Sequence, residues 1–399
     1  MKILIITPRI PYPPYRGDKL KTFNISNELL KRNKVKIVSF LSNTDEAKDV
    51  VELQKKGFDI EVVSLPKIKS WLMMLVGFFS SSPLQVLYYS SDEMHKRIRE
   101  LTSREKFDVV YFHLINSAQY FDSVSDPNSL RVLDFTDATS LYLKRYVDFL
   151  KNPFRKLIFK WEVKKVLKYE SIAKKFDTLF VCSNTDKEFL LKRNVHSNIQ
   201  LLLNGIDLDT FRYESTKLEK GRIIFAGNMS YFPNIDAVMY FAKDVFPLIQ
   251  KRVPSAKFYI VGQQPPPKIL SLQSEAIVVT GFVNDIRKEY LLSSVNVAPI
   301  RFGSGTLNKV IESLLLGVPT VATSLSINGS PIEIKKYVYV ADTPEQFAEK
   351  VVQLILDNSD WKQRVEEAKR TTQDMLGWEK IVQEFEIYLQ ERMNIKKNI

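Results

Sequence analysis

The clearest candidate for chemistry is a stretch in the second half of the chain where an apolar segment leads into a glycine-rich loop. The segment 295–299 is predicted to be a buried strand. The loop after it carries Gly303, Ser304, Gly305 and Thr306, and a helix is expected to follow. Backbone N–H groups at a helix N-terminus, approached through glycines, form an anion site that suits a phosphate or diphosphate.

Two charged residues follow this loop at helical spacing. Lys309 lies one turn into the expected helix, where its ammonium adds positive charge to the anion site. Glu312 comes three residues later on the same helix face. A carboxylate beside a phosphate site is unfavourable unless it accepts hydrogen bonds from sugar hydroxyls, as in dinucleotide folds. The pattern therefore predicts a nucleoside diphosphate site, with a surface Lys–Glu pair as the alternative.

Short apolar strands alternate with helices along the chain. In the first half the predicted strands are 2–7, 35–40, 60–65, 109–112, 131–135 and 178–182. After Asn204-Gly205-Ile206-Asp207 the predicted strands are 222–226, 257–261, 277–280, 295–299, 320–322 and 338–340. Such alternation is typical of parallel sheets with helices on both faces.

We therefore predict an α/β protein with two doubly wound, Rossmann-like domains, at 1–203 and 204–375. A C-terminal helix at 376–399 is expected to cross back and pack on the first domain. Ligands of open parallel sheets bind beyond the carboxyl ends of the strands. Two facing domains of this kind form a cleft where both sets of loops converge.

Composition narrows the class of protein. The chain has 399 residues, of which 45% are hydrophobic and 26% charged, as in folded globular proteins. Its one cysteine, Cys182, suits a reducing compartment. The apolar N-terminus is too short for a signal peptide, and the longest apolar run, 71–79, is shorter than the about 20 residues of a membrane-spanning helix. We expect a cytoplasmic protein.

Positive charge is concentrated in the first half. Residues 1–200 hold 34 Lys and Arg against 23 Asp and Glu, whereas residues 201–399 hold 24 against 23. Between 144 and 175, basic and apolar residues alternate at near-helical spacing. The basic residues of this segment include Lys156, Lys160, Lys164 and Lys165.

A basic amphipathic helix can lie on an anionic membrane, and the apolar run that starts at Trp71 offers a second shallow anchor. The segment thus predicts a membrane or acceptor patch on a peripheral protein at the inner face of the cell membrane. A solvated helix face is the alternative. Nucleic acid is not an expected partner, because no nucleic-acid-binding motif accompanies the charge.

The segment 298–322 resembles the donor-binding motif of the retaining, GT-B-fold glycosyltransferases of family four. It is especially similar to a bacterial subgroup linked to exopolysaccharide and protein-sorting gene clusters. The segment 225–237 resembles the first loop of that subgroup's donor domain, and 280–286 resembles the loop that holds the nucleobase. Asn204-Gly205-Ile206-Asp207 resembles the interdomain signature, and 11–19 resembles the first loop of the acceptor domain.

The resemblance implies the GT-B fold and transfer of a sugar from a nucleoside diphosphate sugar to a hydroxyl acceptor with retention. It implies no metal or other cofactor. The acceptor would be a glycan or a lipid-linked molecule, in cell-surface polysaccharide biosynthesis. In this reading Glu312 bonds the ribose hydroxyls, while Lys309, Gly305 and Thr306 hold the diphosphate.

Further donor contacts follow from the same resemblance. Val283 would meet the base through its backbone, beside Phe282, and Ile286 would pack on the ring. Gly17 would let the acceptor-domain backbone approach the phosphates. Gly227, Asn228 and Ser304 complete the expected donor set.

The chain departs from the family pattern at two places in the donor domain. Many members carry a Glu eight residues before the helix Glu, where this chain has Ser304. Many have an Arg and a Lys in the first donor-domain loop, where this chain offers Asn228 and Asn234. Lys309 is therefore the expected stabiliser of charge on the leaving diphosphate.

Asp137 and His113 are the candidates on the acceptor side. Where a His often follows an acceptor-domain strand, this chain has Asp134-Phe135-Thr136-Asp137. Asp137 would receive the acceptor's proton or orient the sugar, unless it caps the following helix. His113, after the strand 109–112, is a rival. No side chain stands out as a covalent nucleophile, which fits attack from the face of the leaving group.

Other readings stay open at this stage. A nucleotide-sugar epimerase or phosphorylase would keep the fold and change the reaction. A non-catalytic, polybasic membrane scaffold would explain the departure at Ser304. Asp207-Leu208-Asp209 invites a metal-dependent reading, but its place inside the interdomain turn argues against metal.

Overall fold

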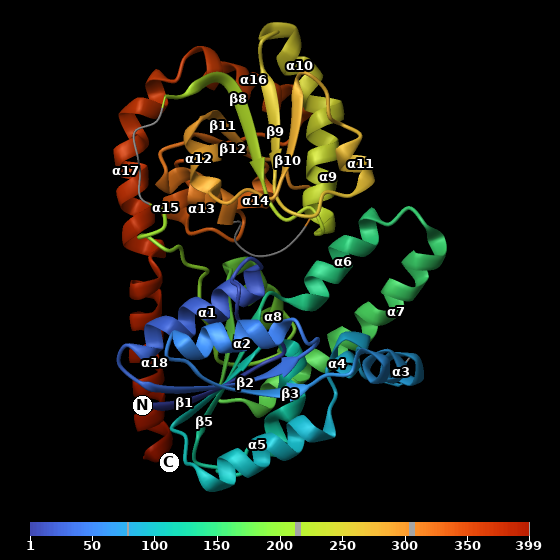
Figure 1. Cartoon of the computed structure of the whole chain (residues 1–399), viewed down its shortest axis with the longest axis vertical. Helices are drawn as coiled ribbons and strands as arrows, with labels where there is room; N and C mark the ends of the chain where they lie inside the picture. The colour runs from blue at the N-terminus through green and yellow to red at the C-terminus, as the bar shows by residue number, and fades with distance from the viewer. Residues whose placement is uncertain (78–79, 212–216, 303–307, 399) are drawn as a thin grey trace. The chain divides into compact units, whose positions relative to one another are not determined.

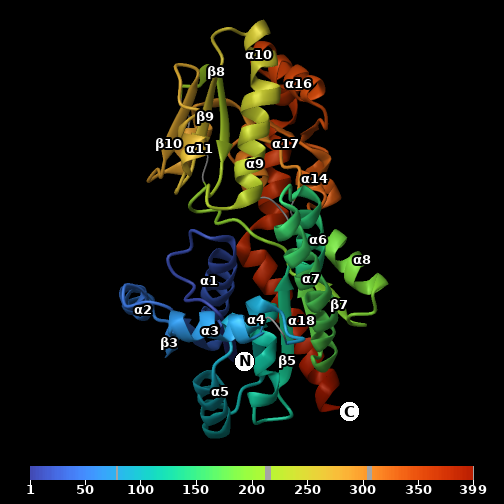
Figure 2. The same cartoon turned by 90° about the vertical axis from the view of Figure 1, so that its right-hand side faces the viewer.

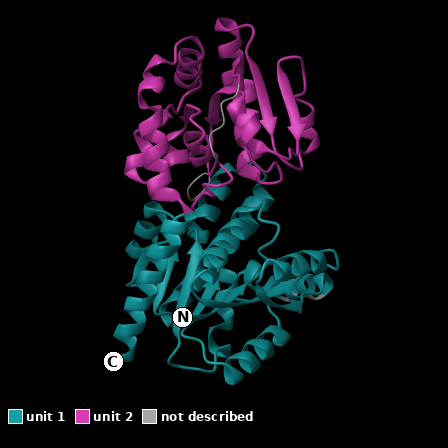
Figure 3. Cartoon of the chain, turned by 60° about the vertical axis from the view of Figure 1, so that its left-hand side comes forward, with its two compact units in different colours: residues 1–203, 378–399 teal, residues 204–377 magenta. Residues whose placement is uncertain are grey.

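The computed structural model describes residues 1–77, 80–211, 217–302 and 308–398. Two compact units make up the chain (Figure 3). Unit 1 comprises Met1–Leu203 and Trp378–Ile399, and unit 2 comprises Asn204–Gly377.

Parallel strands form the sheet of unit 1 (Figure 1). Among the described residues their order is β3-β2-β1-β4-β5-β6-β7. The strands are β1 (Lys2–Thr7), β2 (Lys34–Leu41), β3 (Asp59–Ser64), β4 (Val109–His113), β5 (Leu130–Thr136), β6 (Thr178–Val181) and β7 (Ile199–Leu201). The order reverses between β1 and β4, which is where open sheets of this type bind ligands.

Helices cover both faces of this sheet. They are α1 (Gly17–Leu30), α2 (Glu46–Lys55), α3 (Lys67–Gly77), α4 (Leu84–Tyr88), α5 (Asp92–Arg104), α6 (Thr139–Phe149), α7 (Pro153–Tyr169), α8 (Asn184–Lys192) and α18 (Trp378–Lys397), with short 3-10 helices η1 (Ile115–Ser123) and η2 (Glu170–Lys175). Figure 2 shows α6 and α7 side by side as a helical hairpin.

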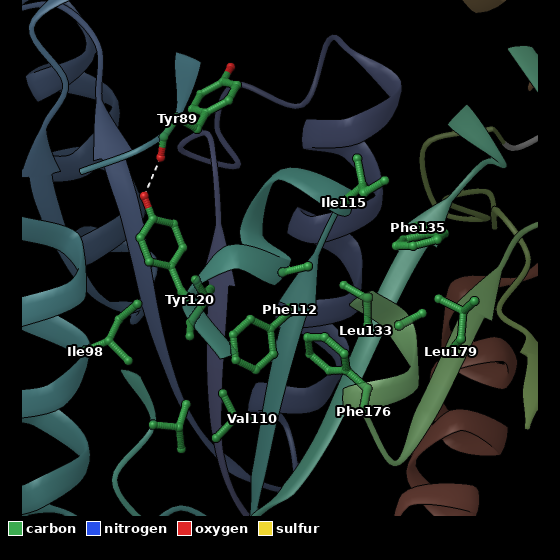
Figure 4. Packing of buried hydrophobic residues seen from close by; sticks show 14 of the residues in the cluster. Tyr89, Ile98, Val110, Phe112, Ile115, Tyr120, Leu133, Phe135, Phe176 and Leu179 are labelled. Atoms are coloured by element: carbon green, nitrogen blue, oxygen red, sulfur yellow. Dashed lines mark hydrogen bonds between the residues drawn. The ribbon is translucent and has the colours of Figure 1, made fainter. Parts of the chain in front are cut away.

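Along β4 and β5, alternate side chains face opposite sides of the sheet and lie in two different environments. Val110 and Phe112 of β4, with Leu133 of β5, point into an apolar core that also holds residues of α5 and η1 (Figure 4). Because successive strand residues face opposite sides, the neighbours Tyr111 and Asp134 face the other way. They meet α1 and α18 instead.

The last described helix, α18, is built into unit 1 although the whole of unit 2 precedes it in sequence. Phe385 packs edge-on against Tyr111 and Phe180, with ring centroids 5.8 and 5.1 Å apart. Glu386 accepts hydrogen bonds from Arg32 at 2.8 Å and Asn33 at 2.6 Å. This helix therefore closes one face of the first sheet.

Unit 2 contains a second parallel sheet, in the order β10-β9-β8-β11-β12-β13 among the described residues. Its strands are β8 (Glu219–Ala226), β9 (Lys257–Val261), β10 (Ile277–Gly281), β11 (Ser293–Ala298), β12 (Thr320–Ala322) and β13 (Tyr339–Val340). Here the order reverses between β8 and β11. The prediction of two doubly wound parallel-sheet domains is confirmed.

The helices of unit 2 also lie on both faces of its sheet. They are α9 (Phe232–Tyr240), the π-helical turn η3 (Phe241–Val245), α10 (Phe246–Arg252), α11 (Pro267–Leu270), α12 (Ile286–Leu291), α13 (Asn308–Leu315), α14 (Ser324–Ile327), α15 (Ile332–Lys335), α16 (Pro344–Leu356) and α17 (Ser359–Leu376). Phe241, Phe258 and Phe347 form an aromatic cluster on one face. Tyr290 and Leu316 pack with Ile224 on the other.

Candidate functional site

The carboxyl ends of β8 and β11 flank the point where the strand order of unit 2 reverses. Gly227 follows β8, and the loop after β11 leads to α13. The predicted donor residues Ser304, Gly305 and Thr306 belong to this loop and lie outside the described residues. The other donor candidates of unit 2 are described, and among them Gly227 lies beside Lys309 of α13.

A buried asparagine anchors the first turn of α13 to the sheet. The Asn296 amide on β11 donates to the backbone carbonyl of Lys309 at 3.1 Å and to the Ser313 hydroxyl at 3.0 Å. It also lies 3.2 Å from the Thr320 hydroxyl on β12. Because buried polar groups are costly when unpaired, this network holds the start of α13 in one place.

Lys309 lies inside unit 2 rather than on its surface, with 7% of the residue exposed. Its ammonium donates to Asn234 Oδ1 at 2.9 Å and lies 3.7 Å from the centroid of the Phe225 ring. Burial lowers the pKa of Lys309 to about 7, an effect that nearby Glu312 partly opposes. The alternative of a surface Lys–Glu pair is therefore wrong.

Glu312 is held by a buried tyrosine. The Tyr290 hydroxyl on α12 donates to the Glu312 carboxylate at 3.0 Å. Burial raises the pKa of Glu312, and the Tyr290 hydrogen bond and Lys309 both pull it back down. Val283 and Ile286 pack against the same apolar cluster as Tyr290, whereas Phe282 is 56% exposed.

Beside this site, the backbone after β9 approaches the backbone after β8 so closely that glycine is required. Gly262, which follows β9, has φ +150°, and a Cβ there would meet the Gly227 carbonyl oxygen at 1.8 Å. At Gly227 a Cβ would lie 2.8 Å from Asn234 Nδ2 and 3.1 Å from Lys309 Nζ. The side chain of Asn228 accepts from the Ser230 backbone N–H at 2.9 Å and so shapes the loop after β8.

A buried ionic cluster occupies the α1 face of the sheet in unit 1. Asp134 is fully buried, 2.9 Å from the Lys21 ammonium, and accepts a 2.5 Å hydrogen bond from Tyr111. Burial alone would raise the pKa of Asp134, but Lys21, the neighbouring His113 and the Tyr111 hydroxyl hold it well below its ordinary value. His113 lies close by, its Nδ1 3.7 Å from Asp134 Oδ2.

The two ring nitrogens of His113 have no hydrogen-bond partner among the described residues, although its side chain is 1% exposed. At 3.7 Å the contact with Asp134 is too long for a hydrogen bond. His113 is thus a buried imidazole at the end of β4 with unused hydrogen-bonding capacity.

Asp137 lies directly after β5, in contact with Cys182 and close to Asp186. The Cys182 thiol donates toward Asp137 at 3.3 Å. Burial, reinforced by the negative charge of Asp186, raises the pKa of Asp137 to about 7. The N-cap of α6 is Ala138, without a side-chain cap bond, so the alternative of Asp137 as a helix cap is wrong.

The ligand-type atoms of Asp137, Cys182 and Asp186 lie within 4.8 Å of one another, a spacing that can suit a metal ion. Both carboxylates already accept hydrogen bonds, Asp137 from the thiol and Asp186 from the Ala138 N–H and the Ser183 hydroxyl. These bonds account for the cluster, and we propose no metal there. The Asp207 carboxylate likewise accepts from the Asp209 backbone N–H at 3.0 Å, as a turn residue does.

Gly17 is exposed at the first position of α1. A Cβ there would meet nothing within 4 Å among the described residues, so the packing of unit 1 does not require glycine at this position.

The predicted patch of α3 and α7 is exposed in part. Lys160 and Lys164 are exposed, Lys156 is half-buried, and Trp71 is 60% exposed. Lys165 is an error in the prediction: it is buried, donates to the Gly77 carbonyl at 3.0 Å and lies over the Trp161 ring. Among the described residues, no helix has both the length and the apolar character needed to cross a bilayer.

Comparison with known proteins connects this geometry to a family. Residues 220–357 match the family described as glycosyl transferases group 1. The chain is also 21% identical over 380 residues to an uncharacterized 44.6 kDa protein in the cps region of Klebsiella pneumoniae, covering 88% of this chain and 90% of that protein.

Solved structures resemble the whole chain. A crystal structure of Anabaena HepE in complex with UDP and glucose has a TM-score of 0.71 at 12% identity, covering 98% of this chain and 99% of HepE. TarM has a TM-score of 0.69 at 12% identity, with 98% of each chain covered. The fold is GT-B, as predicted, and these findings together support a glycosyltransferase.

Proposed function

We propose that the protein is a retaining glycosyltransferase that moves a sugar from a nucleoside diphosphate sugar to a hydroxyl acceptor. The observation that carries this proposal is the placement of Lys309 and Glu312 on α13, beside Gly227, where the strand order of unit 2 reverses; Asn234 bonds Lys309, and Tyr290 bonds Glu312. The match of residues 220–357 to glycosyl transferases group 1 supports it. UDP, which is bound in the HepE structure, is the first nucleotide to test.

In this proposal Glu312, oriented by Tyr290, accepts hydrogen bonds from the ribose hydroxyls. Lys309 and the N-terminus of α13, with Gly305 and Thr306, hold the diphosphate. Val283 and Ile286 meet the base. In unit 1, Gly17 gives the phosphates a close approach to the backbone.

The reaction breaks the bond between the sugar's anomeric carbon and the diphosphate oxygen and forms a bond from that carbon to the acceptor oxygen. Lys309 and the helix N-terminus stabilise the charge that develops on the leaving diphosphate. The acceptor proton passes by one of two routes: to a leaving phosphate oxygen, with Asp137 orienting the acceptor hydroxyl, or to the Asp137 carboxylate itself. His113 is the rival for that role. Since Lys309 supplies the positive charge, we propose that no metal is needed.

A panel of nucleotide sugars tests the proposal, with donor hydrolysis as the readout and calorimetric titration of UDP alongside. We expect binding, donor turnover that increases with a suitable acceptor, and no effect of EDTA. A product with inverted anomeric configuration would exclude retention. Full donor turnover without acceptor would favour an epimerase or phosphorylase, and no binding of any nucleoside diphosphate would favour the non-catalytic scaffold.

We further propose a glycan or lipid-linked acceptor used in cell-surface polysaccharide synthesis, with the protein in the cytoplasm and peripheral at the inner membrane face. Ile68, Trp71 and Leu75 on α3 are between 60% and 79% exposed, and Phe154 and Leu157 on α7 are 71% and 67% exposed. Exposed apolar side chains among basic residues are typical of surfaces that rest on anionic lipid.

A further inference from the structure

Asn234 contacts the ammonium of Lys309 directly. It is 8% exposed, at the start of α9, and its Oδ1 accepts the Lys309 hydrogen bond at 2.9 Å. The two residues are 75 positions apart in sequence. The bond therefore joins the start of α9 to the first turn of α13.

The orientation of the Asn234 amide is fixed by its second partner. Its Nδ2 donates to the backbone carbonyl of Asn228 at 2.8 Å, and a carbonyl oxygen can only accept. The Asn234 oxygen must then face Lys309. Gly227 completes the arrangement, because a Cβ there would press on both Asn234 and Lys309.

We propose that Asn234 is a positioning residue that holds the Lys309 ammonium in place for the donor diphosphate. The inference rests on the proposed function, since it assumes that Lys309 contacts the diphosphate. A neutral amide suits this task better than a carboxylate would. It orients the amine through one lone pair without neutralising its charge or repelling an incoming anion.

The same reasoning predicts that aspartate is a poor replacement for Asn234. An ionised carboxylate only accepts hydrogen bonds, so it would face the Asn228 carbonyl with no donor. It would also form an ion pair with Lys309 that the diphosphate has to displace.

The test compares UDP with uridine, which lacks the phosphates, by calorimetry on the full-length protein. Asn234→Ala should weaken UDP binding about tenfold and leave uridine binding unchanged. Asn234→Asp should weaken UDP binding further, by on the order of a hundredfold. Ser230→Ala is the matched control. Ser230 is exposed in the loop just before α9 and bonds the Asn228 side chain, and its replacement should change neither affinity by more than about twofold.

A double-mutant cycle separates positioning from general loop damage. In a Lys309→Met background, Asn234→Ala should have no further effect on UDP binding. Three results for Asn234→Ala would each overturn this inference without touching the proposed function. They are an equal loss of UDP and uridine binding, a UDP affinity equal to that of the wild type, and a loss of UDP binding that is just as large in the Lys309→Met background. A wild-type protein that binds no UDP or other nucleoside diphosphate would overturn the proposed function, and this inference with it.

Discussion

The hydroxyl of Tyr290 donates a 3.0 Å hydrogen bond to the carboxylate of Glu312. Tyr290 is fully buried and belongs to α12, whereas Glu312 belongs to α13. The bond therefore fixes the carboxylate that we assign to the ribose hydroxyls.

Removing this bond should weaken nucleotide binding without abolishing it. For Tyr290→Phe we expect UDP affinity to fall about tenfold, because a hydrogen bond to a charged group contributes about 1.5–3 kcal/mol. Glu312→Ala should reduce UDP affinity more than Tyr290→Phe does. The loss of affinity caused by Glu312→Ala should be smaller for the 2′-deoxy analogue of UDP than for UDP. Calorimetry with both nucleotides measures this, and equal losses for the two would argue against a ribose contact.

Lys309 should make donor binding depend on pH. Its pKa of about 7 leaves it charged below neutrality and largely neutral above. The terminal phosphate of UDP loses its second proton with a pKa of about 6 and is mostly ionised at pH 7, so the charge of Lys309 dominates and affinity should fall by up to about fifty-fold between pH 7 and pH 9. Lys309→Met should bind weakly with a flat profile over the same range. A flat profile in the wild type would contradict the assignment.

Asp137 should set the acid limb of the rate profile if its ionised form takes part in transfer. With a pKa of about 7, kcat/KM should fall about tenfold per pH unit below neutrality. Asp186→Asn removes a negative charge that raises this pKa, so the limb should move to lower pH. Cys182→Ala removes a hydrogen bond that lowers it, so the limb should move to higher pH. If the acid limb stays at the same pH in both variants, a group other than Asp137 is responsible for it.

The buried pair of Lys21 and Asp134 should matter for stability. Lys21→Met leaves the Asp134 carboxylate buried without its cation, which we expect to lower the free energy of unfolding by about 3–5 kcal/mol. The double variant Lys21→Met/Asp134→Asn should recover part of that loss. The exposed pair Lys55–Glu52 is the control, and Lys55→Met should cost less than about 1 kcal/mol in urea unfolding.

Membrane binding should follow the exposed apolar side chains of α3. Trp71→Ser with Leu75→Ser should reduce flotation with vesicles that contain anionic lipid, and Lys160→Glu with Lys164→Glu should do the same. Ile332→Ser changes a residue of unit 2 that is 73% exposed and should have no effect. Wild-type binding that is equal on neutral vesicles and insensitive to salt would contradict the electrostatic part of this proposal.

Local sequence pattern was sufficient for the fold class. Strands and helices alternate with clear periodicity, and both strand orders follow the doubly wound scheme. Contacts between segments that are far apart in the sequence could not be predicted from this local pattern. Lys165 belongs to a basic helical pattern that indicates exposure, yet its ammonium is satisfied by the Gly77 carbonyl, 88 positions away.

The candidate site shows the same limit. The spacing of Lys309 and Glu312 predicted a shared helix face, because three residues make nearly one turn. The partners Asn234 and Tyr290 lie on other helices and were not assigned, since only the sheet brings α9, α12 and α13 together. A signal existed for Asn234, because it belongs to the segment 225–237, where the family pattern that this segment resembles has an Arg and a Lys.

α18 covers one face of the sheet of unit 1. Because α18 follows unit 2 in sequence, unit 1 cannot complete its fold until unit 2 has been translated. When residues 1–203 have emerged, the faces of Tyr111 and Phe180 that Phe385 later covers are still bare. All of unit 2 is translated before the covering helix arrives. A nascent or prematurely terminated chain would expose this apolar face, so it is a natural target for chaperones and proteases.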